Sequence, residues 1–365
     1  MGLQVGIVGL PNAGKSTLFN ALTRAGAVVA PYPFTTIEPN VGVVPLADER
    51  LQWLAELLRP PRVVPVAVEF VDIAGLVRGS HRGEGLGNQF LHHIRQVDAV
   101  LVLLRAFRAA DVPHPEGTVD PMRDLAVLDT ELILADLATV ERRLERTRAL
   151  ARTKPREYGE ELHFLEQLQA HLNSGQPART LPRTAQEQAI LSGLFLLTEK
   201  PRLYVLNLGE EQVQEAQSLL QPLLARAQAE GGAAMWICAR LEEELAQLDG
   251  PEAQELRQAW GLPPDAVQQL AHAAYDLLGL ISFFTVVGGN EIRAWEIRRG
   301  TTALKAAGKV HSDMERGFIR AEVVSFADLR RSGSLAAARE LGLVRSEGRD
   351  YIVQDGDVIQ FRFSV

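Results

Sequence analysis

The chain has 365 residues, of which 46% are hydrophobic and 23% charged, and its net charge is −8. This length allows two or three domains with cores of their own, and the composition is that of a globular protein. The negative charge argues against a protein that coats nucleic acid by bulk charge. The single cysteine, Cys238, excludes an internal disulfide framework and suits a reducing compartment. With no signal peptide and no apolar run long enough to cross a bilayer, we expect a cytoplasmic protein without a membrane partner.

The first motif is Gly-Leu-Pro-Asn-Ala-Gly-Lys-Ser at residues 9–16, between an expected buried strand over Val5–Val8 and an expected helix. This strand–loop–helix order is the context that a phosphate-binding loop requires. Its backbone N–H groups and the helix N-terminus would bind nucleotide phosphates. We expect Lys15 to reach the β- and γ-phosphates and the Ser16 hydroxyl to bind Mg²⁺. The predicted nucleotide contacts of this segment are Asn12, Ala13, Gly14, Lys15, Ser16 and Thr17.

A second motif follows the expected strand Val68–Val71, which ends at Asp72 and is followed by Gly75. An acidic residue at a strand end with a nearby glycine is typical of P-loop nucleotidases. Asp72 would hold Mg²⁺, and the Gly75 amide would donate a hydrogen bond to the γ-phosphate, which makes Gly75 a predicted catalytic residue beside Lys15. Upstream, Thr36 is favoured over Thr35 as a further metal ligand, although spacing alone does not choose between them.

Leu76 occupies the position where many hydrolysing members of this class carry glutamine to orient the attacking water. A leucine has no polar atom for this task. Either hydrolysis is slow or another group positions the water.

A third motif, Asn207-Leu208-Gly209-Glu210, follows the expected strand Leu203–Leu206, where a GTPase carries Asn-Lys-x-Asp. The GTPase aspartate accepts from two guanine donors and would repel N1 of adenine. Loss of the lysine and the aspartate weakens the case for GTP and leaves Asn207 free to face the donor-and-acceptor edge of adenine. We therefore predict ATP over GTP, with base contacts from Asn207, Leu208 and Glu210.

With these motifs the sequence resembles the YchF (Obg-like ATPase) family of translation-factor-related P-loop proteins. The resemblance spans essentially the whole chain and rests on Pro33–Asn40, Asp72–Leu91, Asn207–Glu210 and Ala307–Glu322. It implies an ATPase that binds GTP more weakly, carries a hydrophobic residue at position 76 and associates with ribosomes.

The resemblance also implies further site residues. His114 matches the place of a water-positioning histidine, Asn12 that of a residue that helps hold K⁺, and Cys238 and Ala239 that of base-contacting backbone. From the residues alone, His114 is a surface-loop histidine and Asn12 tolerates an unusual turn. Both pairs of alternatives stay open, and Mg²⁺ is the only metal that we otherwise predict.

A basic helical segment lies in the middle of the chain. Between Arg142 and Arg156, seven basic residues oppose one acidic residue, a net charge of +6. An apolar seam over 133–151 predicts a long helix that ends at Pro155 and Gly159, and a leucine repeat from Leu162 predicts an antiparallel return. Such a run of basic residues is most simply a charged helix face in contact with solvent. The more specific alternative is that it binds ribosomal RNA phosphates.

After Leu280 the pattern changes to short strands and turns, and Ile359, Phe361 and Phe363 alternate as in a half-buried strand. The resemblance identifies this segment as a TGS domain, a small ubiquitin-like β-grasp module. It carries thirteen basic and eleven acidic residues, a net charge of +2. The candidates for an RNA-facing edge are Arg298, Arg299, Lys305 and Lys309.

Together these patterns predict an α/β protein: a P-loop nucleotidase G-domain with an inserted helical coiled-coil hairpin and a C-terminal β-grasp domain. The expected parts are residues 1–125, 126–193, 194–279 and 280–365. The predicted function is an ATP-binding and ATP-hydrolysing switch that associates with the ribosome. The alternatives are a GTPase of the same class and a nucleotide-dependent ribosome-binding or RNA-binding protein with negligible hydrolysis.

Overall fold

The computed structural model describes residues 3–24, 28–30, 40–73, 86–248, 250–287 and 290–364. The chain divides into a first unit, Met1–Val44 with Glu69–Ala274, and a second unit, Pro45–Val68 with Tyr275–Val365. This division differs from the expected one, which placed residues 45–68 in the nucleotide domain. They belong to the second unit because their strand pairs with a C-terminal strand.

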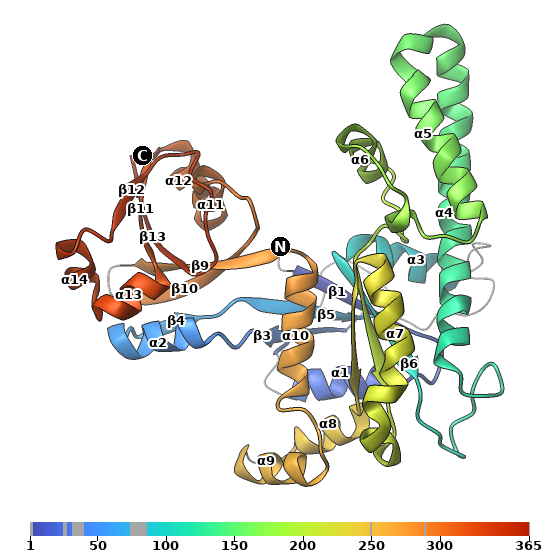
Figure 1. Cartoon of the computed structure of the whole chain (residues 1–365), viewed down its shortest axis with the longest axis horizontal. Coiled ribbons are helices and arrows are strands. Elements are labelled where there is room, and N and C mark those ends of the chain that lie inside the picture. Colours follow the sequence, from blue (N-terminus) through green and yellow to red (C-terminus); the bar gives the residue numbers. More distant parts are fainter. Residues whose placement is uncertain are drawn as a thin grey trace. The chain divides into compact units, whose positions relative to one another are not determined.

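The first unit is built on a seven-stranded sheet with the order β2-β3-β5-β1-β6-β7-β8 (Figure 1). Strands β1, β6, β7 and β8 pair in parallel, and β2 and β3 pair antiparallel. All residues of β6 are buried, as expected of a strand that is covered on both faces. The strands are β1 (Leu3–Val8), β2 (Val28–Ala30), β3 (Val41–Pro45), β5 (Ala67–Asp72), β6 (Ala99–Arg105), β7 (Arg202–Asn207) and β8 (Ala233–Ile237).

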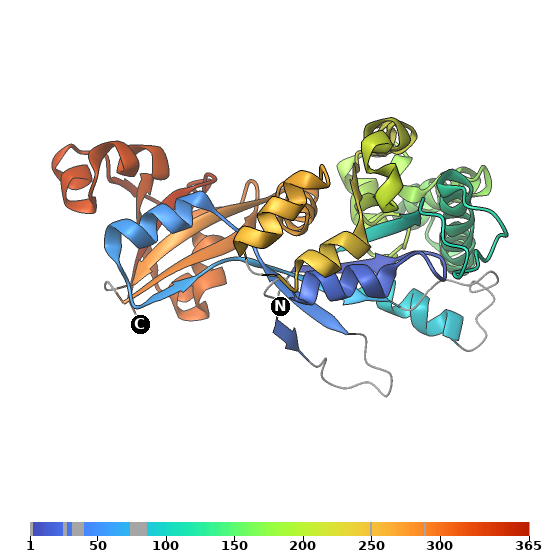
Figure 2. The same cartoon turned by 90° about the horizontal axis from the view of Figure 1, so that it is seen from below.

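Helices lie on both sides of this sheet (Figures 1 and 2). On one side, Val100, Val102 and Leu104 of β6 share a core with α3, α7 and the start of α4. On the other side α1 packs against α8. The helices are α1 (Lys15–Arg24), α3 (Leu86–Gln96), α6 (Ala185–Ser192), α7 (Ala216–Glu230), α8 (Ala239–Leu245), α9 (Gly250–Ala259) and α10 (Ala266–Leu277), with 3-10 turns η2 (Ala178–Thr180) and η3 (Glu210–Glu215).

The predicted helical hairpin is formed by α4 (Pro121–Thr153) and α5 (Pro155–Asn173) (Figure 1). Its own apolar core begins at Ile133, whereas Leu125 and Leu128 still belong to the core of the sheet. The first three turns of α4 are therefore part of the sheet layer and not of the insert. The expectation that Gly159 helps to end the helix is wrong: the chain turns at Lys154, because proline fits the first turn of the next helix.

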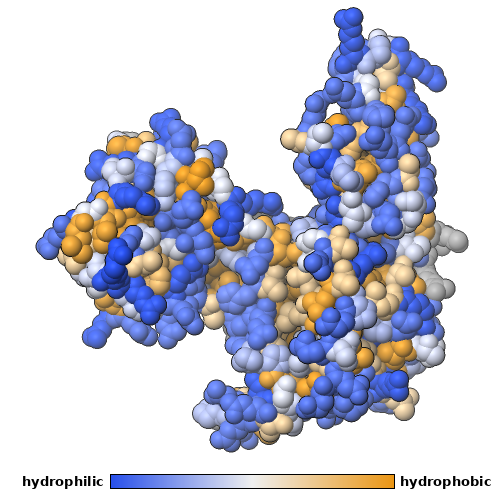
Figure 3. Space-filling model, in the orientation of Figure 1, coloured by the Kyte–Doolittle hydropathy of each residue, from blue (hydrophilic) through white to orange (hydrophobic). Residues whose placement is uncertain are grey.

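The basic stretch of α4 is partly neutralised by α5. Arg148 lies 3.1 Å from Glu166, and Lys154 lies 2.9 Å from Glu157. Arg143 pairs with Glu161 in the same way. The space-filling view shows that hydrophilic side chains dominate the visible face of the hairpin (Figure 3). The net charge of +6 that was counted over residues 142–156, which span the end of α4, the turn and the start of α5, therefore overstates the field of the folded hairpin.

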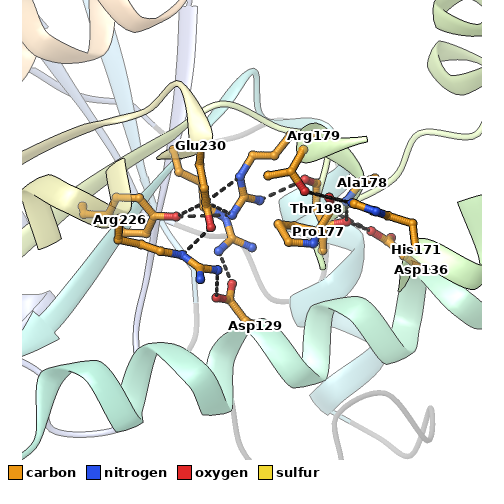
Figure 4. Close-up of polar contacts among 12 residues, drawn as sticks. Asp129, Asp136, His171, Pro177, Ala178, Arg179, Thr198, Arg226 and Glu230 are labelled. Atoms are coloured by element: carbon orange, nitrogen blue, oxygen red, sulfur yellow. Dashed lines mark hydrogen bonds and ion pairs between the residues drawn. The ribbon is translucent and has the colours of Figure 1, made fainter. Parts of the chain in front are cut away.

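A buried ionic cluster fastens the base of the hairpin to the sheet (Figure 4). Asp129 of α4 pairs with Arg202, whose side chain is 1% exposed, and accepts a 3.1 Å hydrogen bond from Arg226 of α7. Glu230 pairs with Arg179 and Arg226. Charges from α4, η2, β7 and α7 meet there, so this cluster fixes where the hairpin leaves the nucleotide fold.

A second buried carboxylate lies two helical turns further along α4. Asp136 is fully buried and accepts hydrogen bonds from the Leu197 N–H at 2.8 Å, the Thr198 N–H at 2.8 Å and the Thr198 hydroxyl at 2.7 Å. Burial raises its pKa to about 6, although these hydrogen bonds oppose the shift.

Asp136 should therefore make stability depend on pH. Between about pH 4 and pH 6 the folded state keeps the proton that the unfolded state has lost, so its contribution to stability falls as the pH rises. We expect the destabilisation caused by Asp136→Asn to shrink by about 2 kcal/mol between pH 4 and pH 7. Urea unfolding of both proteins across this range measures it, and parallel curves would contradict the assignment.

The second unit contains a six-stranded sheet with the order β12-β11-β13-β9-β10-β4. β4 pairs with β10 and β13 with β9 in parallel, and the remaining neighbours are antiparallel. The elements are β4 (Arg62–Val64), β9 (Leu280–Val287), β10 (Glu291–Arg298), β11 (Phe318–Ser325), β12 (Arg345–Glu347), β13 (Asp357–Phe363), α2 (Glu49–Leu58), α11 (Ala303–Val310), α12 (Ser312–Arg316), α13 (Phe326–Ser332) and α14 (Leu335–Glu340).

Its core lies between the sheet and α11, where Ile359 and Phe361 are buried. Phe363, which the alternation predicted to share this face, is 36% exposed because it lies at the end of β13. On the other side, Trp53 of α2 meets Phe326 edge to face at 5.4 Å, and Arg50 binds Asp355 at 2.8 Å. These contacts explain why α2 belongs to this unit.

Every helix of the described residues is too short or too polar to cross a lipid bilayer.

Candidate nucleotide-binding site

The phosphate-binding loop lies between β1 and α1, as predicted. Asn12 and Gly14 have φ angles of 62° and 91°, so the loop turns back on itself before the helix begins. A Cβ at Gly14 would lie 2.3 Å from the Asn207 amide nitrogen, so this position also requires glycine for space. The Lys15 ammonium donates to the carbonyl oxygens of Gly9 and Leu10, each at 3.1 Å, which holds it across the mouth of the loop.

Two of the predicted metal ligands lie at the ends of neighbouring elements. Ser16 is exposed in the first turn of α1, and Asp72 is the half-buried last residue of β5. Burial raises the pKa of Asp72 and lowers that of Lys15, and the attraction between the two charges opposes both shifts. A hydroxyl and a carboxylate beside the phosphate loop are the oxygen ligands that Mg²⁺ prefers. Thr36, Gly75 and Leu76 lie outside the described residues.

A cavity of about 860 Å³ opens beside the loop. It is large enough for a nucleotide. Its walls come from the loop, the segment after β6, the segment after β7 and the start of α8. The predicted residues among its lining are Asn12, Gly14, Lys15, Ser16, Thr17, Asn207, Leu208, Glu210 and Cys238.

Asn207 is not free to face the adenine edge, so that part of the prediction is wrong. Its amide N–H donates to the Ala13 carbonyl at 2.9 Å, and its side-chain oxygen accepts from the Ala239 N–H at 3.1 Å. The buried side chain therefore ties the phosphate loop to the segment after β8. The amide has only one N–H left, so it cannot supply both the donor and the acceptor that pairing with the adenine edge requires.

The residues around Asn207 form the far wall of the cavity. Leu208 is buried and its N–H donates to the Ile237 carbonyl at 2.8 Å. Glu210 is exposed and lies 3.9 Å from Arg240. Cys238 is buried, which raises the pKa of its thiol to about 11, so it carries no thiolate at neutral pH.

Replacing Asn207 by alanine should weaken ATP and GTP binding by the same factor, about ten- to a hundredfold, because Ala13 and Ala239 lose their buried partners. Titration with fluorescent analogues of both nucleotides measures this. Asn173→Ala, at an exposed position on the hairpin, is the matched control and should change neither affinity. A selective loss of ATP binding would instead make Asn207 an adenine reader.

His114 is buried behind the phosphate loop and does not line the cavity. Its Nε2 lies 2.8 Å from Asp124 Oδ2, and its Nδ1 accepts from the Glu116 N–H at 3.1 Å. Both ring nitrogens are therefore engaged in this conformation. The side chain would have to leave Asp124 to contact a water at the γ-phosphate.

Arg105 is a residue that the sequence analysis missed. Its buried guanidinium donates to the carbonyl oxygens of Val112 at 2.8 Å and Pro113 at 3.3 Å, and it stacks on Phe107 at 4.4 Å. Pro113 also accepts from the Asn12 amide at 3.0 Å. Arg105 thus fastens the His114 loop to the phosphate loop. The available signal was an arginine that ends an otherwise apolar strand.

Comparison with known proteins shows the family of the chain. The chain is 48% identical over 367 residues to the Bacillus subtilis "Ribosome-binding ATPase YchF" and 46% identical over 365 residues to its Escherichia coli O157:H7 counterpart, and each match covers all of both chains. The chain belongs to the YchF family. A family model described as "50S ribosome-binding GTPase" matches residues 4–135, and the model of the YchF C-terminal domain, described as a protein of unknown function, matches residues 280–364.

The YchF fold is also found among solved structures. The structure of the Schizosaccharomyces pombe YchF GTPase matches with a TM-score of 0.87 and 34% identity, over 99% of this chain and 98% of that one. This confirms the predicted fold class. Within the described residues no group of three histidine, cysteine, aspartate or glutamate side chains could hold a metal ion.

Proposed function

We propose that this chain is a nucleotide-dependent switch that binds and hydrolyses ATP and associates with the ribosome. The observation that carries the proposal is the cavity of about 860 Å³ that joins the phosphate loop to the segments after β7 and β8. The bacterial relatives are named ribosome-binding ATPases, and the solved relative is named a GTPase. GTP hydrolysis is therefore the second candidate, and cytoplasm is the compartment that a ribosomal partner requires.

Each predicted site residue would have a separate role in ATP hydrolysis. Lys15 and the Gly75 amide would stabilise the charge on the γ-phosphate during in-line attack by water. Ser16, Thr36 and Asp72 would hold Mg²⁺, which neutralises charge on the β- and γ-phosphates when bound. His114 would orient the attacking water once it has left Asp124.

A monovalent cation has a candidate ligand in the phosphate loop. The Asn12 amide N–H already donates to the Pro113 carbonyl, so Oδ1 is the atom that would face K⁺. The base would lie against Leu208, Glu210 and Cys238, which line the cavity, whereas Ala239 does not line it and its N–H already donates to Asn207. Hydrolysis measured in K⁺ and in Na⁺ tests the cation, and equal rates would remove Asn12 from this role.

The first experiment is titration of purified, nucleotide-free protein with ATP and GTP in Mg²⁺. A preference for ATP supports the proposal, and a preference for GTP supports the second candidate. Single-turnover hydrolysis with and without ribosomes, together with co-sedimentation, tests the switch. If the hydrolysis rate is negligible and ribosomes do not raise it, the switch model is wrong and the protein uses the nucleotide only as a ligand.

A further inference from the structure

The side chain of His114 is paired with a buried carboxylate at the start of α4. Its Nε2 lies 2.8 Å from Asp124 Oδ2, and the two side chains are 4% and 3% exposed. The other ring nitrogen, Nδ1, accepts from the Glu116 backbone N–H at 3.1 Å. A backbone N–H can only donate, so Nδ1 carries no proton, and Nε2 holds the proton that it donates to Asp124. His114 is therefore neutral, and neither ring nitrogen has a free lone pair in this conformation.

This arrangement keeps His114 from acting on water. A histidine that orients or deprotonates a water needs a ring nitrogen that is available to it. His114 and Asp124 line a gap that is too small to admit a water molecule, and the opposite wall of this gap is formed by the phosphate-loop residues Leu10, Pro11 and Ala13. The ring therefore lies on a dry side of the loop, outside the lining of the nucleotide cavity.

The segment that carries His114 nevertheless reaches the cavity. Val112 lines the cavity and lies two positions before His114, a span of about 7 Å between Cα atoms. The intervening residue, Pro113, is fixed to the phosphate loop, because its carbonyl accepts from the Asn12 amide at 3.0 Å. Only the chain after Pro113 would have to move to bring the ring to the cavity, once its hydrogen bond to Asp124 is broken.

The position of Asp124 is itself fixed by its neighbours. Its second oxygen, Oδ1, accepts from Arg123 Nη2 at 3.1 Å, and Arg123 also donates to the Thr118 hydroxyl at 2.8 Å. The next residue, Leu125, belongs to the core of the sheet. A hydrogen bond from an imidazole N–H to a carboxylate is roughly twice as strong as one between neutral groups. This turn of α4 therefore offers His114 a rigid and favourable partner away from the nucleotide.

We propose that Asp124 is a positioning residue that holds His114 in an inactive place and so keeps the basal rate of hydrolysis low. The inference rests on the proposed function, in which His114 acts on the attacking water. When the held conformation is the major one, the basal rate is proportional to the small population in which the ring is released. The opposite role, in which Asp124 orients His114 during the reaction, would require both side chains to reach the cavity, and neither lines it.

The first test is single-turnover hydrolysis of ATP by the full chain carrying Asp124→Asn. Asparagine keeps the shape of aspartate without its charge, so it binds His114 more weakly, and the rate should rise about tenfold. The affinity for ATP should be unchanged, because Asp124 does not line the cavity. In a His114→Ala background the same substitution should change nothing, since no histidine is left to release. A merely structural role would give the same effect in both backgrounds.

Asp120→Asn is the matched control. Asp120 is exposed, and its side chain accepts from the Met122 and Arg123 backbone N–H groups at the start of α4. Asparagine caps a helix about as well as aspartate does, so this variant removes a negative charge from the same helix end without touching His114. Its hydrolysis rate should stay within about twofold of the wild-type value.

The release of the ring is measured separately, without nucleotide, by modification of histidines with diethyl pyrocarbonate and mass spectrometry of the peptides. His163, exposed on the hairpin, is the internal reference. Modification of His114 relative to His163 should be faster in Asp124→Asn by the same factor as hydrolysis, because both report the released population.

The inference is overturned if Asp124→Asn slows hydrolysis or leaves it unchanged, if the acceleration persists without His114, or if His114 is modified no faster than in the wild-type chain. If the wild-type chain hydrolyses no ATP with or without ribosomes, the proposed function fails instead. The modification experiment then still decides whether Asp124 holds the ring, so the two failures are distinguishable.

Discussion

Replacing Asp129 by alanine is expected to lower the free energy of unfolding of the first unit by about 3–5 kcal/mol. Asp129 is the carboxylate that pairs with Arg202, whose side chain is almost completely buried. Among the described residues, Arg202 Nε and Nη2 already lack hydrogen-bond partners, so the substitution would remove the one carboxylate that pairs with this buried cation. Thermal unfolding followed by circular dichroism should show a midpoint lower by about 10 °C.

Glu145→Ala provides the matched control for this prediction. It removes one carboxylate from the same helix at an exposed position and should cost no more than about 0.5 kcal/mol. Combining Asp129→Leu with Arg202→Met should recover most of the lost stability, because the pair is then replaced by apolar side chains. A single Asp129→Ala variant as stable as the wild-type chain would show that Arg202 is hydrated or paired elsewhere.

The phosphate loop could be predicted from the sequence because its geometry is local. Residues 9–16 need only a preceding strand, a following helix and glycine where the backbone reverses, and all of these lie within twenty positions. The same holds for Asp72, since a strand end in a parallel sheet faces the edge where ligands bind. Strand β6 is also recognisable from local sequence, because residues 99–104 are all apolar, as in a strand that is covered on both faces.

The long-range hydrogen bonds and ion pairs that hold the site together could not be predicted in this way. Asn207 bonds to Ala13, 194 positions away, and Arg202 pairs with Asp129, 73 positions away. A single sequence does not show which group a polar side chain will bind, so Asn207 was predicted to be available for a hydrogen bond to the base. Residues 45–68 were misassigned for a similar reason: the pairing of β4 with β10 joins segments more than two hundred residues apart.

Replacing Lys15 by alanine is expected to slow single-turnover ATP hydrolysis about 10²–10³-fold, the effect of removing one preorganised donor from a site of charge development. The ammonium is held by the Gly9 and Leu10 carbonyls in a partly buried position, where its charge is screened less than in water. Hydrolysis is measured by quenched-flow with protein in excess over radiolabelled ATP. Weaker ATP binding should accompany the loss of rate, because Lys15 would also contact the phosphates in the ground state.

Lys200→Ala is the control that distinguishes the slower hydrolysis of Lys15→Ala from the effect of removing any partly buried lysine. Lys200 belongs to the same unit, and its ammonium donates to the Val97 carbonyl at 2.5 Å, but it does not line the cavity. The variant should lose some stability and keep its hydrolysis rate within about twofold of the wild-type value, because no charge of the reaction develops near it. If Lys15→Ala hydrolysed ATP as fast as Lys200→Ala, residues 9–16 would not be the catalytic phosphate site, since a lysine that contacts the transferred phosphate cannot be removed without a loss of rate.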